Sequence, residues 1–594
     1  MQKKRRTNRR LRNVVDPMEF LRRLGMCLEC DTPNTPADVV NAPLPSLTGK
    51  TVDEFRDQYL IAEVLSKYQN FDLGIDTHRV AVQSFIDQEA TNKESNERLL
   101  SLPTENFRVI NSFELARRKI GQVLGQFDWD LFMDGLRHGP GATTRLSRRE
   151  SAIPNKLSGK PYSTSSCYNL AYAILTESPS WAFNISNVVS PENLLVIREW
   201  DDEECVTKNA KTDRYIRKQP DMNVVIQLAI AYVMRRKFQR WNINLNDQSI
   251  NQRRAKEGSI TGAIATVDWR NASNSLCCSL VYQLIGNNHA DYIDPTWYNL
   301  MEASRVELGM VDGQLRALEM FSANGNGYTF ETESLIFWSL ARAVCEVLGI
   351  PQDVTIYGDD LTLPSEAVPL LLEVGRYAGL TINLKKTHYE SHELTFRESC
   401  GKHYVNGYDV SPFYVREELS TVADLILLCN NIKRWARLEY GLDGRLKPLY
   451  DWLVSFLPRT ALETCIPFGE ANDGLIKDFD EAVPEVVHSG PINRRLASDG
   501  ITWVRVNWSS QRLGYRCKTL KEVSRGCRVD GELGVLTWLY LKSFKRYTPV
   551  KDPRDRFQVT SPEAYRRPTM KVSRKTGKRV VNRWEDTGPW ITRE

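Results

Sequence analysis

The sequence lacks the marks of a membrane-spanning or disulfide-stabilised protein. No apolar run is long enough to cross a bilayer, and the nearest candidate, 224–234, is too short. The basic start has no apolar signal core after it. The 12 cysteines are scattered without the framework of a disulfide-rich protein. We therefore expect a chain that stays in a reducing cytoplasm.

The chain also lacks internal repeats and low-complexity linkers that would divide its 594 residues into independent units. A net charge of +5 is too small to argue for nucleic acid by itself. Positive charge is instead concentrated in an N-terminal arm over 3–12 and a C-terminal stretch over 566–583. Such segments contact nucleic acid or remain solvated tails, and both interpretations stay open.

The most informative stretch is 355–363, which reads TIYGDDLTL. Apolar strand residues flank a Tyr-Gly-Asp-Asp turn and Pro364 follows, a pattern that predicts a β-hairpin. Asp359 and Asp360 would repel each other at its tip unless a cation lay between them. Mg²⁺ fits, because it takes hard oxygen ligands and keeps water and phosphates in its shell. The alternative is an ordinary Gly-Asp turn.

Three further features suit a metal and phosphate site. The stretch 260–268 predicts a buried strand ending in a third carboxylate, Asp268, unless that residue only caps a helix. A Gly-Asn-Gly loop at 325–327 precedes a helix predicted over 329–348, and its glycines allow a nucleotide close approach or simply form a turn. A cationic ribbon over 206–218 suits a triphosphate, or else a solvated edge strand; its cations are Lys208, Lys211, Arg214 and Arg217.

Carboxylates on two strands, cations before them and lysines after them fit nucleotidyl transfer with two metal ions. One ion would lower the pKa of the attacking 3′-hydroxyl, and the other would stabilise the leaving pyrophosphate. Catalysis of phosphoryl transfer is then mostly positioning and charge neutralisation.

The order of these motifs resembles the palm of viral RNA-directed RNA polymerases. In detail it is similar to the replicase beta subunit of single-stranded RNA bacteriophages, the group that includes MS2 and Q-beta. The resemblance is dense over 207–416 and rests on the blocks KNAKTDR, DQSINQR, ATVD, GNGYTFE, YGDD and FRESCGKHY. The sequence departs from the family's pattern at Arg270, Asn274 and Asn324.

The resemblance implies a role for each matched residue. Asp268, Asp359 and Asp360 would bind two Mg²⁺ ions, with Mn²⁺ as an alternative. Lys386, or its neighbour Lys385, would approach the pyrophosphate as a general acid. The residues that would bind the nucleotide are Lys208, Lys211, Arg214 and Arg217 along its path, and Ser273, Gly325 and Asn326 near its ribose.

The implied fold is α+β, a right-hand polymerase with fingers, a palm made of an antiparallel sheet plus helices, and a helical thumb. Residues 1–205 would form the N-terminal region and fingers, and 206–258 the fingers with the nucleotide-binding cations. Residues 259–418 would form the palm, including a finger insertion near 285–320. Residues 419–594 would form the thumb and the C-terminal region.

The implied function is replication of a phage RNA genome, begun without a primer, in the cytoplasm of the bacterial host. The implied partners are template and product RNA, nucleoside triphosphates, the elongation factors Tu and Ts, and ribosomal protein S1, with no membrane. Two alternatives remain: a reverse transcriptase built on the same palm, and a catalytically inactive RNA-binding protein on a polymerase fold.

Overall fold

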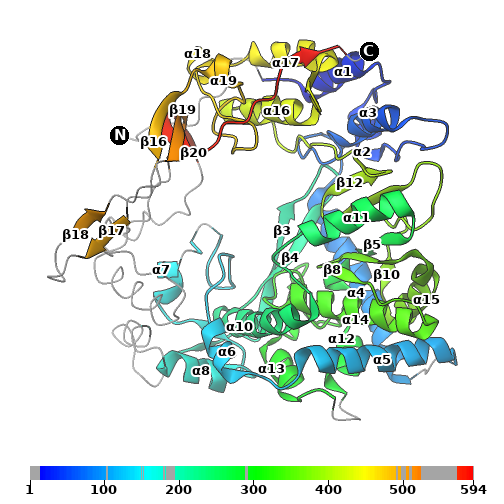
Figure 1. Ribbon diagram of the computed structural model, residues 1–594. Helices are drawn as coiled ribbons and strands as arrows, with labels where there is room; N and C mark the ends of the chain where they lie inside the picture. Colours follow the sequence, from blue (N-terminus) through cyan, green and yellow to red (C-terminus); the bar gives the residue numbers. More distant parts are fainter. Residues whose placement is uncertain are drawn as a thin grey trace.

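The computed structural model is a mixed structure of α-helices and β-sheets (Figure 1). It describes residues 14–101, 105–148, 150–151, 153–177, 181, 194–287, 292–489, 493–496, 503–506, 512–523 and 571–592. The N-terminal basic arm and the first residues of the C-terminal basic stretch lie outside these ranges. Within them, no helix is both long and apolar enough to cross a membrane.

The antiparallel sheet at the centre carries the acidic hairpin. Its strand order is β10-β5-β9-β8. The predicted hairpin is confirmed, because β8 and β9 pair across a turn at Gly358 and Asp359. The strands are β5 (Ile264–Arg270), β8 (Thr355–Tyr357), β9 (Asp360–Pro364) and β10 (Thr381–Ile382).

The strand predicted over 260–268 begins later and ends later than expected. Helix α11 (Ser249–Thr261) still includes Ile260, whose side chain is 63% exposed, and Gly262 ends the helix in the left-handed conformation. Strand β5 continues to Arg270, so Asp268 lies inside a strand rather than at its end. Its place beside the hairpin follows from antiparallel pairing, and not from the end of a parallel strand.

A second sheet, of order β4-β3-β6-β7, contains the cationic ribbon. Strand β3 (Trp200–Thr207) pairs with β4 (Asp213–Lys218), and β6 (Leu308–Val311) and β7 (Gln314–Ala317) join its other edge. Part of the insertion expected near 285–320 therefore belongs to the same sheet as the ribbon. A third sheet has the strands β11 (Phe396–Ser399), β12 (Lys402–Val405) and β13 (Tyr408–Asp409), with a turn at Asn406-Gly407 before the last.

Two large hydrophobic cores, each with more residues than the two others, hold most of the described chain together. The larger one surrounds the central sheet with α5 (Phe107–Leu124), α10 (Asp221–Phe238), α14 (Thr329–Leu348) and α15 (Val368–Ala378). The predicted helix over 329–348 is confirmed as α14. The smaller core joins α1 (Pro17–Leu28) and α3 (Val52–Glu63) to α16 (Val422–Trp435) and α17 (Lys447–Val454). In Figure 1 these blue and yellow helices lie together at the top.

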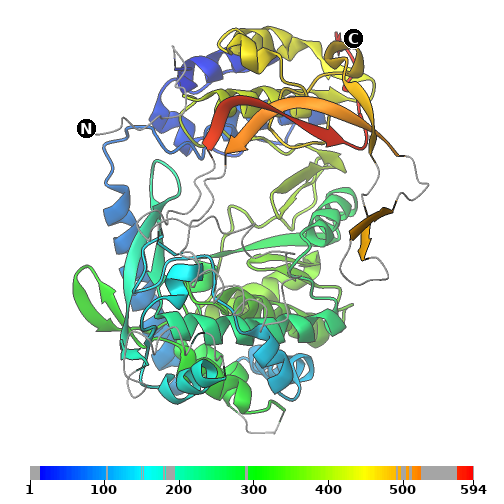
Figure 2. The ribbon, with the colours of Figure 1, turned by 90° about the vertical axis from the view of Figure 1, so that its left-hand side faces the viewer.

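Residues near the start of the sequence thus share one core with residues beyond 420, through Phe20, Leu24 and Leu60 on one side and Leu425 and Leu449 on the other. A division of the chain into consecutive segments did not anticipate this packing. Beyond it, β19 (Arg512–Val523) pairs with β20 (Lys571–Val581) and forms the long orange and red ribbon of Figure 2.

Candidate active site

Strand pairing brings the three predicted metal-binding aspartates together. Asp268 on β5 is directly opposite Asp360 on β9, and Asp359 precedes Asp360 in the turn. The Oδ2 atom of Asp268 accepts a hydrogen bond of 2.8 Å from Nδ2 of Asn383. The Nζ atom of Lys386 is 3.9 Å from Oδ1 of Asp268. All four residues predicted to be catalytic therefore lie in one neighbourhood.

The electrostatics of this neighbourhood favour added positive charge. Burial, together with the negative charge of Asp359, raises the pKa of Asp360 to about 6. Burial also raises the pKa of Asp268, against the opposing influence of Lys386. Partial burial disfavours the charged form of Lys386, but the neighbouring carboxylates, Asp268 first, outweigh it and raise the lysine's pKa.

The cationic ribbon divides into two groups. Lys208 lies in the turn after β3, and its pKa is lowered by burial and by Arg214 and Lys386, while Asp268 opposes the shift. Arg214 is exposed on β4. Lys211 donates a hydrogen bond of 2.7 Å from Nζ to Oδ1 of Asn41. These three cations remain compatible with a path for a triphosphate.

Arg217 is different, and the prediction that it lines this path is wrong. Its guanidinium is buried and donates a hydrogen bond of 2.9 Å from Nε to Oδ1 of Asp201 and one of 2.7 Å from Nη1 to the carbonyl of Met310. Side chains alternate between the two faces of a strand, so residues three apart on β4, such as Arg214 and Arg217, face opposite sides. The inward guanidinium is held by its partner carboxylate.

Asn274 links the two segments that contain the residues predicted near the ribose, Ser273 in one and Gly325 and Asn326 in the other. Oδ1 of Asn274 accepts a hydrogen bond of 3.2 Å from the backbone nitrogen of Asn324, immediately before the Gly-Asn-Gly loop. Gly325 has a φ of +119°, and a Cβ atom there would lie 2.0 Å from the carbonyl oxygen of Arg217. The loop containing Asn326 is thus pressed against β4, where only glycine fits at position 325.

Several residues at the site were not predicted. Nδ2 of Asn251 donates a hydrogen bond of 2.8 Å to the carbonyl of Asp360, and Oγ1 of Thr355 donates one of 2.9 Å to Oδ1 of Asn251. Asn251 belongs to the polar stretch 245–254, which contains the DQSINQR block. The contacts show that this stretch holds the acidic hairpin on α11.

The N-terminal region also borders the site, and no motif in its sequence predicts this. The Nζ atom of Lys67 is 3.5 Å from the ring centre of Tyr414, and burial lowers the pKa of Lys67 while Glu63 and Glu398 oppose the shift. Glu398 on β11 is a fourth carboxylate near the aspartates, and burial raises its pKa.

The donors at this site fit divalent cations. Within the described ranges no group of three or more His, Cys, Asp or Glu side chains forms a ready-made metal site. Mg²⁺, however, is usually held by one or two carboxylates together with water and substrate phosphates, rather than by a closed cage of protein ligands. Partly buried carboxylates whose pKa values are raised, such as Asp268 and Asp360, suit that role.

A buried acid behind the site predicts a pH dependence of stability. Oγ of Ser273 donates a hydrogen bond of 2.7 Å to Oε2 of Glu333, and burial raises the pKa of Glu333 to about 8. Between the unfolded pKa near 4.5 and the folded value, the folded chain holds a proton that the unfolded chain releases. Stability should therefore fall as pH rises through this range, by up to about 1.4 kcal/mol per pH unit from this group.

The measurement is thermal unfolding of the native chain and of Glu333→Gln between pH 6 and pH 8.5. The glutamine variant has the same shape and no proton to lose, so its stability should fall less steeply with pH. Equal pH slopes for the two proteins would contradict the expected protonation of Glu333.

Comparison with known proteins shows the family of the chain. A family model described as "RNA replicase, beta-chain" matches residues 24–477. The RNA-directed RNA polymerase subunit beta of Escherichia virus Qbeta is 41% identical over 435 residues, which are 72% of this chain and 70% of that relative. The subunit of the same name from Enterobacteria phage SP is 36% identical over 450 residues, 74% of each chain. A solved structure titled "RdRp complex" overlaps only slightly, with a TM-score of 0.36 and 12% identity over 60% of this chain and 33% of that one.

These matches define the class of the protein: it is an RNA-directed RNA polymerase. Within this class the chain belongs to the RNA replicase beta-chain family of the RNA phages.

Proposed function

We propose that this enzyme joins ribonucleotides on an RNA template by a two-metal mechanism centred on Asp268, Asp359 and Asp360. The observation that carries the proposal is the register of β5 and β9, which sets Asp268 opposite Asp360 beside the turn residue Asp359. Two Mg²⁺ ions, or Mn²⁺ in their place, would supply an activated 3′-hydroxyl and a stabilised pyrophosphate there.

The chain's own residues would bind and orient the substrates. Lys208, Lys211 and Arg214 would neutralise the triphosphate on its way to the aspartates. Ser273, Gly325 and Asn326 would lie at the ribose, where backbone and amide groups can distinguish a 2′-hydroxyl. Lys386, which is close to Asp268, would give a proton to the departing pyrophosphate.

We assign the central sheet and its helices to a palm, the sheet of β3, β4, β6 and β7 to fingers, and the helices from α16 onward to a thumb. The corresponding ranges are 1–205 and 206–258 for the N-terminal region and fingers, 259–418 for the palm and 419–594 for the thumb and C-terminal region. The shared core of α1, α3, α16 and α17 adds residues from the start of the chain to the thumb.

The biological setting is proposed from the family. The enzyme would replicate a phage RNA genome in the cytoplasm of a bacterial host and begin synthesis without a primer. Its relatives are named as beta subunits, which suits a chain that works with partners. The partners proposed are the host elongation factors Tu and Ts and ribosomal protein S1.

The test is incorporation of labelled ribonucleotides by the purified chain on an RNA template, with Mg²⁺ and without primer, alone and with bacterial cytosolic extract. Synthesis that stops on chelation and in Asp359→Asn is the expected result. Incorporation of deoxyribonucleotides instead would indicate a reverse transcriptase. RNA binding without synthesis in either condition would indicate an inactive RNA-binding protein.

The assignment of Lys386 makes a separate prediction. Lys386→Met should reduce the incorporation rate by about a hundredfold, the usual loss for a general acid. Lys385→Met is the matched control, since Lys385 is the likewise exposed neighbour that forms no ion pair with Asp268 within the described chain. The rates of both variants should be measured from pH 6 to pH 9. A larger loss in the Lys385 variant would reverse the assignment.

A further inference from the structure

A chain of buried amides leads from the Gly-Asn-Gly loop into the protein, with Gln227 of α10 at its centre. The Oε1 atom of Gln227 accepts a hydrogen bond of 2.9 Å from the backbone nitrogen of Gly327. Its Nε2 atom donates one bond of 2.7 Å to the carbonyl of Ser304 and one of 3.2 Å to Oε1 of Gln219. The side chain is fully buried, so each of these bonds is made inside the protein.

The same chain continues to the buried ion pair of the fingers sheet. The Nε2 atom of Gln219 donates a hydrogen bond of 2.6 Å to Oδ2 of Asp201, the carboxylate that holds Arg217. The backbone nitrogen of Arg217 in turn donates a bond of 2.7 Å to the carbonyl of Asn324. One buried network therefore holds the loop at Asn324 and at Gly327, on either side of Asn326.

The loop also lies in direct contact with this network. A Cβ atom at Gly327 would lie 2.9 Å from the Cβ of Gln227, and one at Gly325 would overlap the backbone of Arg217. The loop therefore cannot move closer to α10 or β4. Its remaining freedom is to move away from them, and the bond from Gly327 to Gln227 opposes that movement.

We infer that Gln227 is a positioning residue for ribonucleotide selection, which it serves by fixing the loop that presents Asn326 to the ribose. The inference rests on the proposed function of that loop. Gln227 is buried behind the loop and acts through Gly327. Loss of this anchor leaves the aspartates in place but lets Asn326 take several positions. Discrimination against deoxyribonucleotides should therefore suffer more than the rate of the chemical step.

The test compares Gln227→Met with Asn223→Leu in the full-length chain. Asn223 is the matched control, because it lies one turn earlier on α10, is fully buried and donates a bond of 3.0 Å to the same carbonyl of Ser304. No hydrogen bond joins Asn223 to the loop in the described part of the chain. Both variants lose buried hydrogen bonds, so both should unfold at a lower temperature.

Of these two variants, Gln227→Met alone should lower the ratio of kcat/KM for ribonucleotides to that for deoxyribonucleotides, by about tenfold. The loss should appear mainly as a higher KM for ribonucleotides. A second variant, Gln227→Asn, keeps an amide in the network but shortens it, and should show the same loss. The test therefore does not depend on the methionine variant folding.

Unchanged discrimination in both Gln227 variants, or an equal loss in Asn223→Leu, would overturn the inference and leave the proposed function standing. Failure of the proposed function would give a different result: the native chain would make no RNA, or Asp359→Asn would make as much RNA as the native chain.

Discussion

Asp268→Asn is expected to lower RNA-templated incorporation by about a thousandfold while leaving thermal stability unchanged or higher. Asparagine has nearly the same shape and keeps an oxygen that can accept the bond from Asn383, but it lacks the charge that a divalent cation needs. Stability should not fall, because burial and Asp359 already disfavour the charge on Asp268. The lost attraction to Lys386 is small, since that lysine side chain is 57% exposed.

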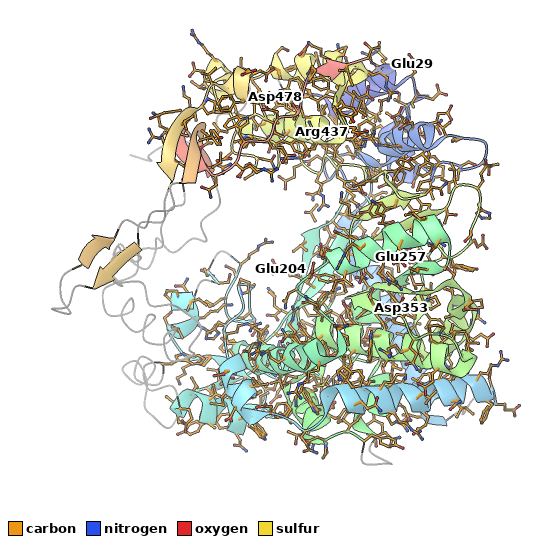
Figure 3. All side chains as sticks on the ribbon, in the orientation of Figure 1. Glu29, Glu204, Glu257, Asp353, Arg437 and Asp478 are labelled. Atoms are coloured by element: carbon orange, nitrogen blue, oxygen red, sulfur yellow. The ribbon has the colours of Figure 1, made fainter. Side chains whose placement is uncertain are left out.

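The control is Asp353→Asn, labelled in Figure 3. Asp353 is a carboxylate with 58% of its side chain exposed that pairs with Arg254, and it lies before β8 rather than in the turn that carries Asp359 and Asp360. Its loss should change stability by no more than about 0.5 kcal/mol and leave synthesis intact. Rates and thermal midpoints are measured on the same preparations. Synthesis retained in Asp268→Asn would remove Asp268 from the catalytic group, and a large fall in its midpoint would show a structural role instead.

The parts of the site that were predictable carry local signals. Alternating apolar residues around Gly358 predict a hairpin, because strand and turn preferences are set by neighbours in sequence. The helix α14 is likewise predictable from its apolar residues. The contact between Asp268 and Asp360 is not local, since it depends on the register of β5 against β9. The resemblance to a known family predicts that these two aspartates lie together, whereas the residues alone do not decide it.

The parts that were missed depend on packing between distant segments. Lys67 reaches the site only because α3 shares a core with α16, and nothing near Lys67 in sequence signals this. Glu333 lies on a helix whose composition is that of an ordinary apolar element, and its raised pKa follows from burial. Burial of a charged residue is a property of the folded chain, so spacing alone cannot reveal it.

Arg217 is the clearest case of a charged residue whose burial the sequence does not reveal. Arg217→Met is expected to destabilise the folded chain by about 3–5 kcal/mol. The methionine fills part of the space but leaves the carboxylate of Asp201 buried, with the bond from Gln219 as its remaining side-chain partner among the described residues. An uncompensated buried charge is the largest cost in such a change. Lost packing adds to this cost. The guanidinium lies close against Gly309, where an added Cβ atom would be 2.0 Å from it.

Arg214→Met on the same strand is the matched control for denaturant unfolding. Arg214 is exposed, so its replacement should change the free energy of unfolding by no more than about 0.5 kcal/mol. It should instead raise the KM for nucleoside triphosphates if it neutralises the triphosphate as proposed. The double variant Asp201→Asn with Arg217→Met should regain part of the lost stability, because it removes the stranded charge as well as its partner. Equal stability losses at positions 214 and 217 would contradict the distinction between a cation that faces the substrate and one that holds the fold.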